Sequence, residues 1–212
     1  IVSKMAKDNH LGNMIYLHDL DKYTVGSHNC LSIPFDDLLA KGFNTRQTDV
    51  RPAGSVNTAF QLVAVIFQLQ SLQQFGGVSA THLDWTMVPY VRKSFAKHFL
   101  DAMEWVYEND YNIRPQFEGY DLKNVSIDFE TMSYPDIHCF YKENSKAYQY
   151  ALQMTEREIH QAVEGLYHNL NTLQSRSGNQ LPFTSINYGT CTLPEGRMIT
   201  KALLDVSIEG LG

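Results

Sequence analysis

The sequence predicts a mixed α/β fold, and three observations support that prediction. Several stretches repeat apolar residues every three or four positions, as helices with one buried face do. A strand-like alternation at residues 181–188 lies between two of these stretches, and the order helix, strand, helix is typical of α/β architectures. With 43% hydrophobic residues among 212, the chain can bury a core and is not a disordered tail.

Two helices are expected within residues 55–108. The first begins at Ser55 and ends near Phe75, because apolar residues recur at helical spacing and Gly76-Gly77 follows. The second begins near Thr81 and should be kinked by Pro89. We expect the two to form an antiparallel hairpin. The first has no charged residue, which either a helix-bundle dimer contact or burial inside one large domain would explain.

Residues 155–212 are expected to form a helix, a strand and a second helix. Thr155 and Glu158 have the spacing of a capping box, which predicts a helix start. The stretch 192–195 repeats that spacing and contains a proline, which predicts the start of the last helix. In the strand between them, one face carries Phe183, Ser185 and Asn187.

Composition excludes several classes of protein. The 17 basic and 23 acidic residues give a net charge of −6, which disfavours binding to nucleic acid. Apolar runs such as Leu62 to Phe67 are far shorter than the roughly 20 residues that cross a bilayer, so we expect no membrane association. Three cysteines form no disulfide framework, and reduced thiols indicate a cytoplasmic location.

General catalytic motifs are absent from the sequence. It has no glycine-rich phosphate loop, HExxH, paired CxxC or GxSxG pattern. His138-Cys139 resembles half a zinc site, but His160 and His168 lie eight residues apart, and we expect no metal site. Cys30 follows an acidic and histidine-rich stretch, and local composition leaves it either a core cysteine or a reactive thiol.

At these residues the sequence resembles the catalytic subunit of the anaerobic, glycyl radical class of ribonucleoside-triphosphate reductase. The similarity runs in order along the whole chain, which is more specific than any single motif. The lack of an initiator Met and the ending after Gly210 predict an internal piece of a longer protein. The matching segments are His18-Asp19-Leu20-Asp21, Asn29-Cys30, Gly42-Phe43, Pro52, Ser55, Phe75-Gly76-Gly77, Val88-Pro89-Tyr90-Val91, Lys97-His98, Asn171-Thr172-Leu173, residues 178–190 and residues 208–212.

The resemblance implies that residues 1–212 are part of a ten-stranded α/β barrel with a helix hairpin used for dimerisation. In that family a thiyl radical removes the ribose 3′ hydrogen and the 2′ hydroxyl leaves as water. Cys30 then corresponds to the cysteine that donates hydrogen towards C2′, with Asn29 before it. His18 and Asp21 are implied near the barrel mouth, and Ser185 and Asn187 on the substrate side, although ordinary barrel packing explains the last two equally well.

The resemblance also implies cofactors and partners. Deoxynucleoside triphosphate effectors would bind beside the hairpin, where Lys97, Arg51 and Arg92 are candidate cations, the alternative for each being a solvated surface charge. The glycyl radical, a structural zinc site and the thiyl-radical cysteine are expected beyond Gly212. This segment would bind no cofactor and would be inactive alone. The whole protein would be a homodimer, activated by a radical SAM enzyme, that reduces ribonucleoside triphosphates to deoxyribonucleoside triphosphates for DNA synthesis.

Two alternatives remain open at this point. The chain could be a non-catalytic nucleotide-binding and dimerisation module that needs none of its thiols. It could also belong to another glycyl radical enzyme that acts on small carbon substrates, but Asn29-Cys30 and residues 178–189 resemble the reductase branch.

Overall fold

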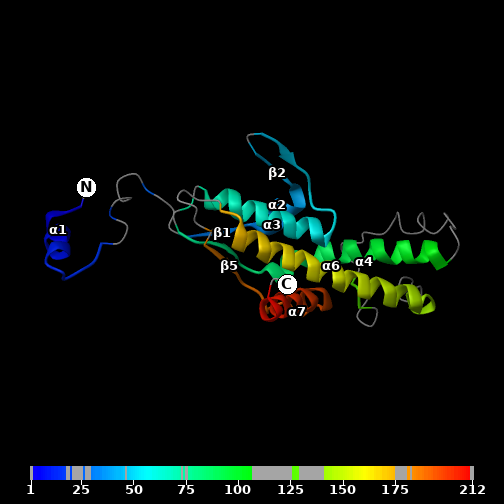
Figure 1. The fold of residues 1–212 in the computed structure, drawn as a ribbon. Helices are drawn as coiled ribbons and strands as arrows, with labels where there is room; N and C mark the ends of the chain where they lie inside the picture. Colours follow the sequence, from blue (N-terminus) through cyan, green and yellow to red (C-terminus); the bar gives the residue numbers. More distant parts are fainter. Residues whose placement is uncertain are drawn as a thin grey trace.

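The computed structural model describes residues 2–17, 20, 26, 30–45, 47–72, 74, 76–106, 126–128, 141–174, 181 and 183–210. Figure 1 shows their arrangement: helices pack along one side of a small sheet, and α1 lies apart from the rest near the N-terminus. The elements are α1 (Lys4–Leu11), β1 (Leu31–Ile33), α2 (Phe35–Lys41), β2 (Phe43–Asn44), β3 (Asp49–Val50), α3 (Val56–Ser71), β4 (Val78–Ala80), α4 (Leu83–Val106), α6 (Ser145–Thr172), β5 (Thr184–Ile186) and α7 (Pro194–Glu209).

A three-stranded parallel sheet lies beneath the helices. Its strand order is β1-β4-β5, and the strands are in register, so that Ser32, Ser79 and Ser185 form one row across it. Helix α3 lies in the connection from β1 to β4, and α4 and α6 lie in the connection from β4 to β5. Parallel strands require such crossovers, so the sheet confirms the predicted mixed α/β class.

The predicted helix hairpin is modified by one of these strands. Helices α3 and α4 lie where the sequence predicts them, and Pro89 lies inside α4. Between them, however, Val78 and Ala80 are buried in β4 and pair with both neighbouring strands. The two helices of the predicted hairpin pack against each other, and each also belongs to one of two successive strand–helix–strand units. A strand of three small residues is too short to show a periodic signal.

Helix α6 is the centre of the helical layer. It packs against α3, α4 and α7, and Figure 1 shows it running lengthwise across the others. The buried side chains at these contacts are large and apolar, so they supply most of the hydrophobic stabilisation of this part of the chain. The largest fully buried ones on these four helices are Phe60, Phe67, Phe95, Phe99, Leu83, Met87, Met103, Ile159, Leu166, Ile199 and Leu203.

Neither predicted capping box caps a helix. Thr155 lies inside α6, ten residues after its start, and its hydroxyl donates to the Ala151 carbonyl at 2.7 Å. Helix α7 does begin at Pro194, but no side chain caps it, and Glu195 is fully buried. The first box fails because α6 has already begun ten residues earlier, and the second because Leu193, and not Thr192, is the N-cap of α7. Both acidic residues instead bind partners far away in the sequence, which a local motif does not reveal.

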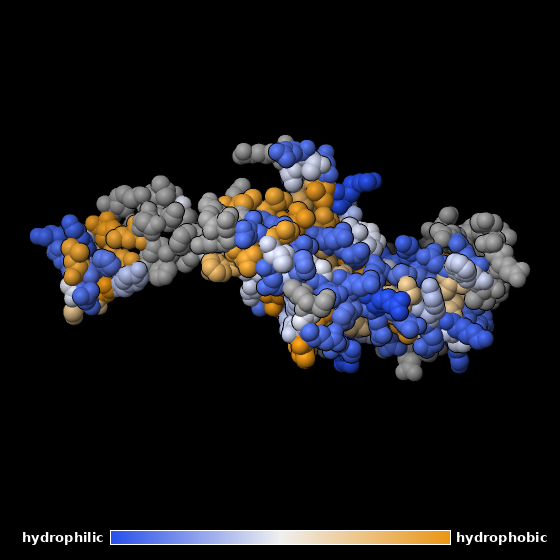
Figure 2. Space-filling view, viewed as in Figure 1, coloured by the Kyte–Doolittle hydropathy of each residue, from blue (hydrophilic) through white to orange (hydrophobic). Residues whose placement is uncertain are grey.

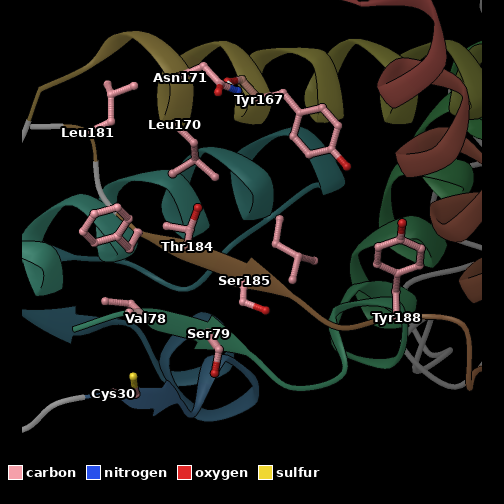
Figure 3. Close-up of a pocket in the computed structure, with 13 residues that line it drawn as sticks. Cys30, Val78, Ser79, Tyr167, Leu170, Asn171, Leu181, Thr184, Ser185 and Tyr188 are labelled. Carbon is pink, nitrogen blue, oxygen red and sulfur yellow. Dashed lines mark hydrogen bonds between the residues drawn. The ribbon is translucent and has the colours of Figure 1, made fainter.

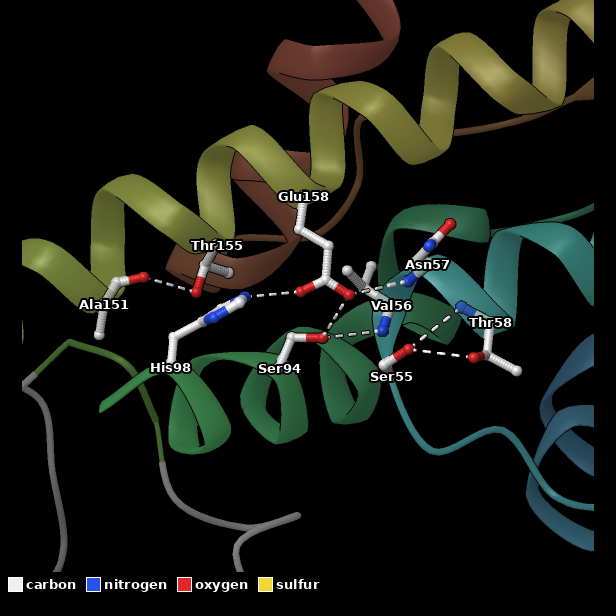
Figure 4. Close-up of polar contacts among 9 residues, drawn as sticks. All are labelled: Ser55, Val56, Asn57, Thr58, Ser94, His98, Ala151, Thr155 and Glu158. Atoms are coloured by element: carbon white, nitrogen blue, oxygen red, sulfur yellow. Dashed lines mark hydrogen bonds and ion pairs between the residues drawn. The ribbon is translucent and has the colours of Figure 1, made fainter. Parts of the chain in front are cut away.

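Glu158 connects three helices (Figure 4). From α6 its Oε2 lies 2.8 Å from His98 Nε2 on α4, and its Oε1 accepts hydrogen bonds from the Ser94 hydroxyl at 3.2 Å and from the Asn57 amide at 3.4 Å. The Ser94 hydroxyl in turn accepts a bond from the Val56 amide at 2.9 Å. The first amides of a helix have no partner inside it, so this carboxylate completes the N-terminus of α3.

Replacing Glu158 with Gln should lower the free energy of unfolding by about 1–2 kcal/mol at neutral pH, because a charged acceptor is lost. Burial alone would raise the pKa of Glu158, but the hydrogen bond and charge of His98, with the bonds from Asn57 and Ser94, hold that pKa below its usual value. A lowered pKa stabilises the fold above the unfolded value of about 4.3, and that contribution disappears as pH falls through the folded value.

Denaturant unfolding of the wild type and the Glu158→Gln variant at pH 7 and at pH 3 measures this difference. The two proteins should converge in stability at the lower pH. Glu156→Gln is the matched control on the exposed side of the same helix, and it should change stability by less than about 0.5 kcal/mol. A gap between wild type and Glu158→Gln that persists undiminished at pH 3 would contradict the assignment of the effect to the carboxylate charge.

Candidate functional site

A pocket of about 750 Å³ lies along the parallel sheet and the C-terminal end of α6 (Figure 3). It combines residues from the start of the chain, the middle strand, the last strand and α6, so it depends on the whole sheet being assembled. Its lining residues are Cys30, Gly77, Val78, Ser79, Tyr167, Leu170, Asn171, Leu181, Phe183, Thr184, Ser185, Ile186 and Tyr188.

Cys30 lies directly before β1, is exposed and forms no disulfide. The next residue anchors the chain there, because the Leu31 amide donates to the Gly77 carbonyl at 3.0 Å. Side chains alternate along a strand, so Cys30 shares a face with Ser32 rather than with the buried Ile33. The predicted reactive thiol therefore lies on the solvent-accessible face of the sheet.

A row of serine hydroxyls continues that face across the sheet. The hydroxyls of Ser32 and Ser79 lie 3.0 Å apart, and Ser185 occupies the same register position on β5. The other face is apolar and packs against the helices, with Val78 and Ala80 buried. The sheet thus has one hydrophobic face and one face that carries a thiol and hydroxyl groups, which can form hydrogen bonds to a polar ligand.

The predicted substrate-side residues have different positions. Cys30 and Ser185 both line the pocket. Asn187 lies just beyond the end of β5, where its amide donates to the Ala80 carbonyl at 2.9 Å, and its exposed side chain is not among the described lining residues. His18, Asp21 and Asn29 lie outside the residues that the structure describes.

Helix α6 forms one wall of the pocket, and the sequence did not predict its residues as part of the site. The Tyr167 hydroxyl donates to the Leu203 carbonyl and accepts from the Ser207 hydroxyl, both at 3.2 Å. Burial raises the pKa of Tyr167, the Ser207 hydrogen bond lowers it, and the net shift is upward, so its hydroxyl stays neutral. Asn171 donates to the Tyr167 carbonyl at 2.7 Å. Asn171 lies in a segment that resembles the reductase family but was not predicted as a site residue, and no motif marks Tyr167.

Cys191 lies away from the exposed thiol face. It is buried at the segment before α7, and burial raises the pKa of its thiol. Its sulfur packs so closely on Gly196 that a Cβ at residue 196 would lie 2.3 Å from it. This environment suits a packed, protonated thiol and not a nucleophile.

The three predicted cations are in two kinds of environment. Lys97 on α4 and Arg51 after β3 are exposed. Arg92 is not, because its side chain is 12% exposed and its Nε donates to Glu195 Oε1 at 2.8 Å. Glu195 is fully buried on α7, and the Ile127 amide donates to the same oxygen at 3.0 Å. Arg92 thus forms a largely buried ion pair between α4 and α7.

The described residues offer no metal site. No group of three or more His, Cys, Asp or Glu side chains among them is arranged to hold an ion. His160 contacts Glu209 at 3.1 Å, while His138 and Cys139 lie outside the described ranges. Within those same ranges, no helix is both long enough and apolar enough to cross a membrane.

Comparison with known proteins gives one consistent match. The family model for anaerobic ribonucleoside-triphosphate reductase matches residues 1–212. The anaerobic ribonucleoside-triphosphate reductase of Enterobacteria phage T4 is 27% identical over 204 residues, which cover 96% of this chain and 27% of that protein. The protein of the same name from Haemophilus influenzae is 27% identical over 213 residues, which cover 100% of this chain and 25% of that protein. The protein of the same name from Escherichia coli K12 is 29% identical over 199 residues, which cover 93% of this chain and 23% of that protein. The chain spans about a quarter of the length of these relatives.

Proposed function

Because this chain belongs to the anaerobic ribonucleoside-triphosphate reductase family, we propose that it forms the part of a longer reductase that holds a ribonucleoside triphosphate against Cys30. The observation that carries this proposal is the exposed Cys30 thiol on the hydroxyl-bearing face of the sheet, in a pocket of about 750 Å³. A pocket of this size can enclose a nucleotide.

The chemistry assigned to Cys30 follows from the weakness of its S–H bond. The radical that starts the reaction is supplied by parts of the protein outside this segment and removes the 3′ hydrogen. The 2′ hydroxyl then takes up a proton and leaves as water, Cys30 gives a hydrogen atom to C2′, and the removed hydrogen is returned to C3′. The reductant, formate or a redoxin, supplies the two electrons and restores the Cys30 thiol. After giving up its hydrogen, the Cys30 sulfur can share an electron with a second sulfur. An alcohol at this position could not do so, and a thiol is therefore suited to it. Ser185, and Asn187 beyond it, would bind ribose or phosphate oxygens.

The parallel sheet is proposed to be a section of the ten-stranded barrel, with its hydroxyl face inside. In the described part of the chain β1 and β5 are the sheet edges. Exposed strand edges invite further pairing, so both can continue into neighbouring strands of the longer protein. Closure into a barrel would place the Cys30 face around an enclosed substrate.

Helix α3 is proposed to form the dimer contact, together with α4. Its outer side is uncharged and exposes Val65 and Leu69, with the exposed Leu72 directly after it, and Figure 2 shows hydrophobic surface over this helix. Lys97 and Arg51 are the exposed cations available to effector phosphates near these helices. The glycyl radical, the zinc site and the contact with a radical SAM activating enzyme would belong to the remainder of the protein.

An anaerobic assay of the full-length protein tests this function. After activation, with formate or a redoxin as the reductant, it should convert ribonucleoside triphosphates to deoxyribonucleoside triphosphates. The alternative, a nucleotide-binding and dimerisation module, predicts a dimer that binds deoxynucleoside triphosphates and forms no product with either reductant. Product formation would exclude that alternative, and its absence from correctly activated protein would refute the reductase proposal.

A further inference from the structure

A buried carboxylate joins the carboxyl ends of β4 and β5. Asp84 lies in the first turn of α4, shortly after β4, and is fully buried. Its Oδ2 accepts hydrogen bonds from the amides of Gly189 at 2.9 Å and Cys191 at 2.8 Å. The other oxygen, Oδ1, is buried with no hydrogen-bond partner among the described residues. The two bonds to Oδ2 therefore supply the compensation that a buried carboxylate needs, and they tie the segment after β5 to α4.

Neighbouring residues of α4 hold the same segment. The Leu83 amide donates to the Asn187 carbonyl at 3.0 Å, and Trp85 Nε1 donates to the Thr190 hydroxyl at 3.1 Å. Three consecutive residues of α4 therefore fix residues 187–191. The segment has no regular secondary structure, and Gly189 has a φ of 100°, a conformation that favours glycine. Its path is thus set by these contacts and not by a continuing strand.

The fixed segment continues directly from the wall of the pocket. Ser185 and Tyr188 line the pocket, and Tyr188 is the residue just before Gly189. A shift of residues 187–191 would move Tyr188 directly and would disturb the adjoining end of β5, which carries Ser185. Cys30, Gly77 and Phe183 line the pocket just before β1, β4 and β5, so the pocket runs along the sheet from the amino ends of the strands to Tyr188, beyond the carboxyl end of β5, where Asp84 acts.

We infer that Asp84 is a positioning residue of the substrate site: it touches no substrate, but by holding residues 189 and 191 it fixes Ser185 and Tyr188 in the wall of the pocket that Cys30 also lines. This inference rests on the proposed function, because the pocket is taken to hold the ribonucleotide. It assigns a role in catalysis to a residue that lies outside the pocket.

Kinetics of the full-length protein test the inference. Asp84→Ala removes the oxygen that accepts both hydrogen bonds, so kcat/KM for the ribonucleoside triphosphate should fall by about 100-fold, the effect of a misplacement near 1 Å, while deoxynucleotide effector binding stays unchanged. Asp84→Asn keeps a carbonyl oxygen that can accept both amides and should stay within about tenfold of wild type. Asp84→Glu keeps the charge, but its side chain is longer by one methylene group and displaces residues 189–191, so it should behave like Asp84→Ala. It takes the place of Asp84→Ala in the test if the alanine protein does not fold.

Thr155→Val is the matched control. It removes another fully buried hydrogen bond, from the Thr155 hydroxyl to the Ala151 carbonyl, and should leave kcat/KM within about twofold. The inference fails if Asp84→Glu keeps wild-type kcat/KM, if Asp84→Asn is as impaired as Asp84→Ala, or if Thr155→Val shows an equal loss. A wild-type protein that forms no product refutes the proposed function instead, and binding of CTP to wild type and Asp84→Glu then decides the positioning role.

Discussion

Replacing Cys30 with alanine in the full-length protein should reduce deoxyribonucleotide formation by more than about 10³-fold, as removal of a central catalytic group does. Alanine has no hydrogen that it can give to C2′ and no sulfur to accept the remaining electron. The side chain is exposed on one face of the sheet, so its loss should cost little stability. Product formation in an anaerobic assay measures the effect.

Cys191→Ala is the control for this experiment. Cys191 is buried in packing against Gly196, away from the pocket, so its loss should reduce stability but leave turnover per folded molecule unchanged. Effector binding should be unchanged in both variants. Wild-type turnover by the Cys30→Ala protein would refute the assignment of Cys30, and a dead Cys191→Ala protein with normal stability would show that the wrong thiol was chosen.

Replacing Arg92 with methionine should lower the free energy of unfolding by about 3–5 kcal/mol, because it leaves a buried carboxylate without its counter-charge. Glu195 is fully buried and lies 2.8 Å from the guanidinium of Arg92, whereas a solvated cation would have little effect on stability. The double variant Arg92→Met/Glu195→Leu should recover a large part of the loss, since two apolar residues can fill the site. Denaturant unfolding of the single and double variants measures both effects.

This experiment also separates two roles of Arg92. If it were an effector-binding cation, as the resemblance implied, methionine would weaken deoxynucleotide binding and leave stability almost unchanged. Lys41→Met provides the comparison, because its partner Asp37 and Lys41 itself are both largely exposed. Breaking that surface pair should cost at most about 0.5 kcal/mol.

The sequence predicted those parts of the fold that repeat over many residues. The apolar stripes of α3 and α4 placed both helices to within a few residues, and the strand at Thr184–Ile186 lay inside the predicted alternation. It did not predict β1 and β4, since three residues are too few to show a period. The predicted start of α6, at Thr155, is ten residues too late. The capping pattern there was preferred to the apolar stripe, which begins earlier with Ala147, Tyr148 and Ala151.

For the site, the sequence predicted residues but not their neighbours. Cys30 and Ser185 were identified through resemblance, and the register of the sheet explains why they share one face. Ser79 and Tyr167 could not be found in the same way, because they reach the pocket through long-range pairing and helix packing. Asp84 shows the same limit: its partners lie more than 100 positions along the chain, at Gly189 and Cys191.

The origin of the hydrogen at C2′ tests the central claim most directly. Thiol hydrogens exchange with water, so a hydrogen delivered by Cys30 in D₂O should be deuterium. Full-length protein that reduces a ribonucleoside triphosphate in D₂O should give a deoxyribonucleotide carrying deuterium at C2′, detected by mass spectrometry and NMR. A product with only protium at C2′ would contradict the role of Cys30 as the hydrogen donor in this pocket.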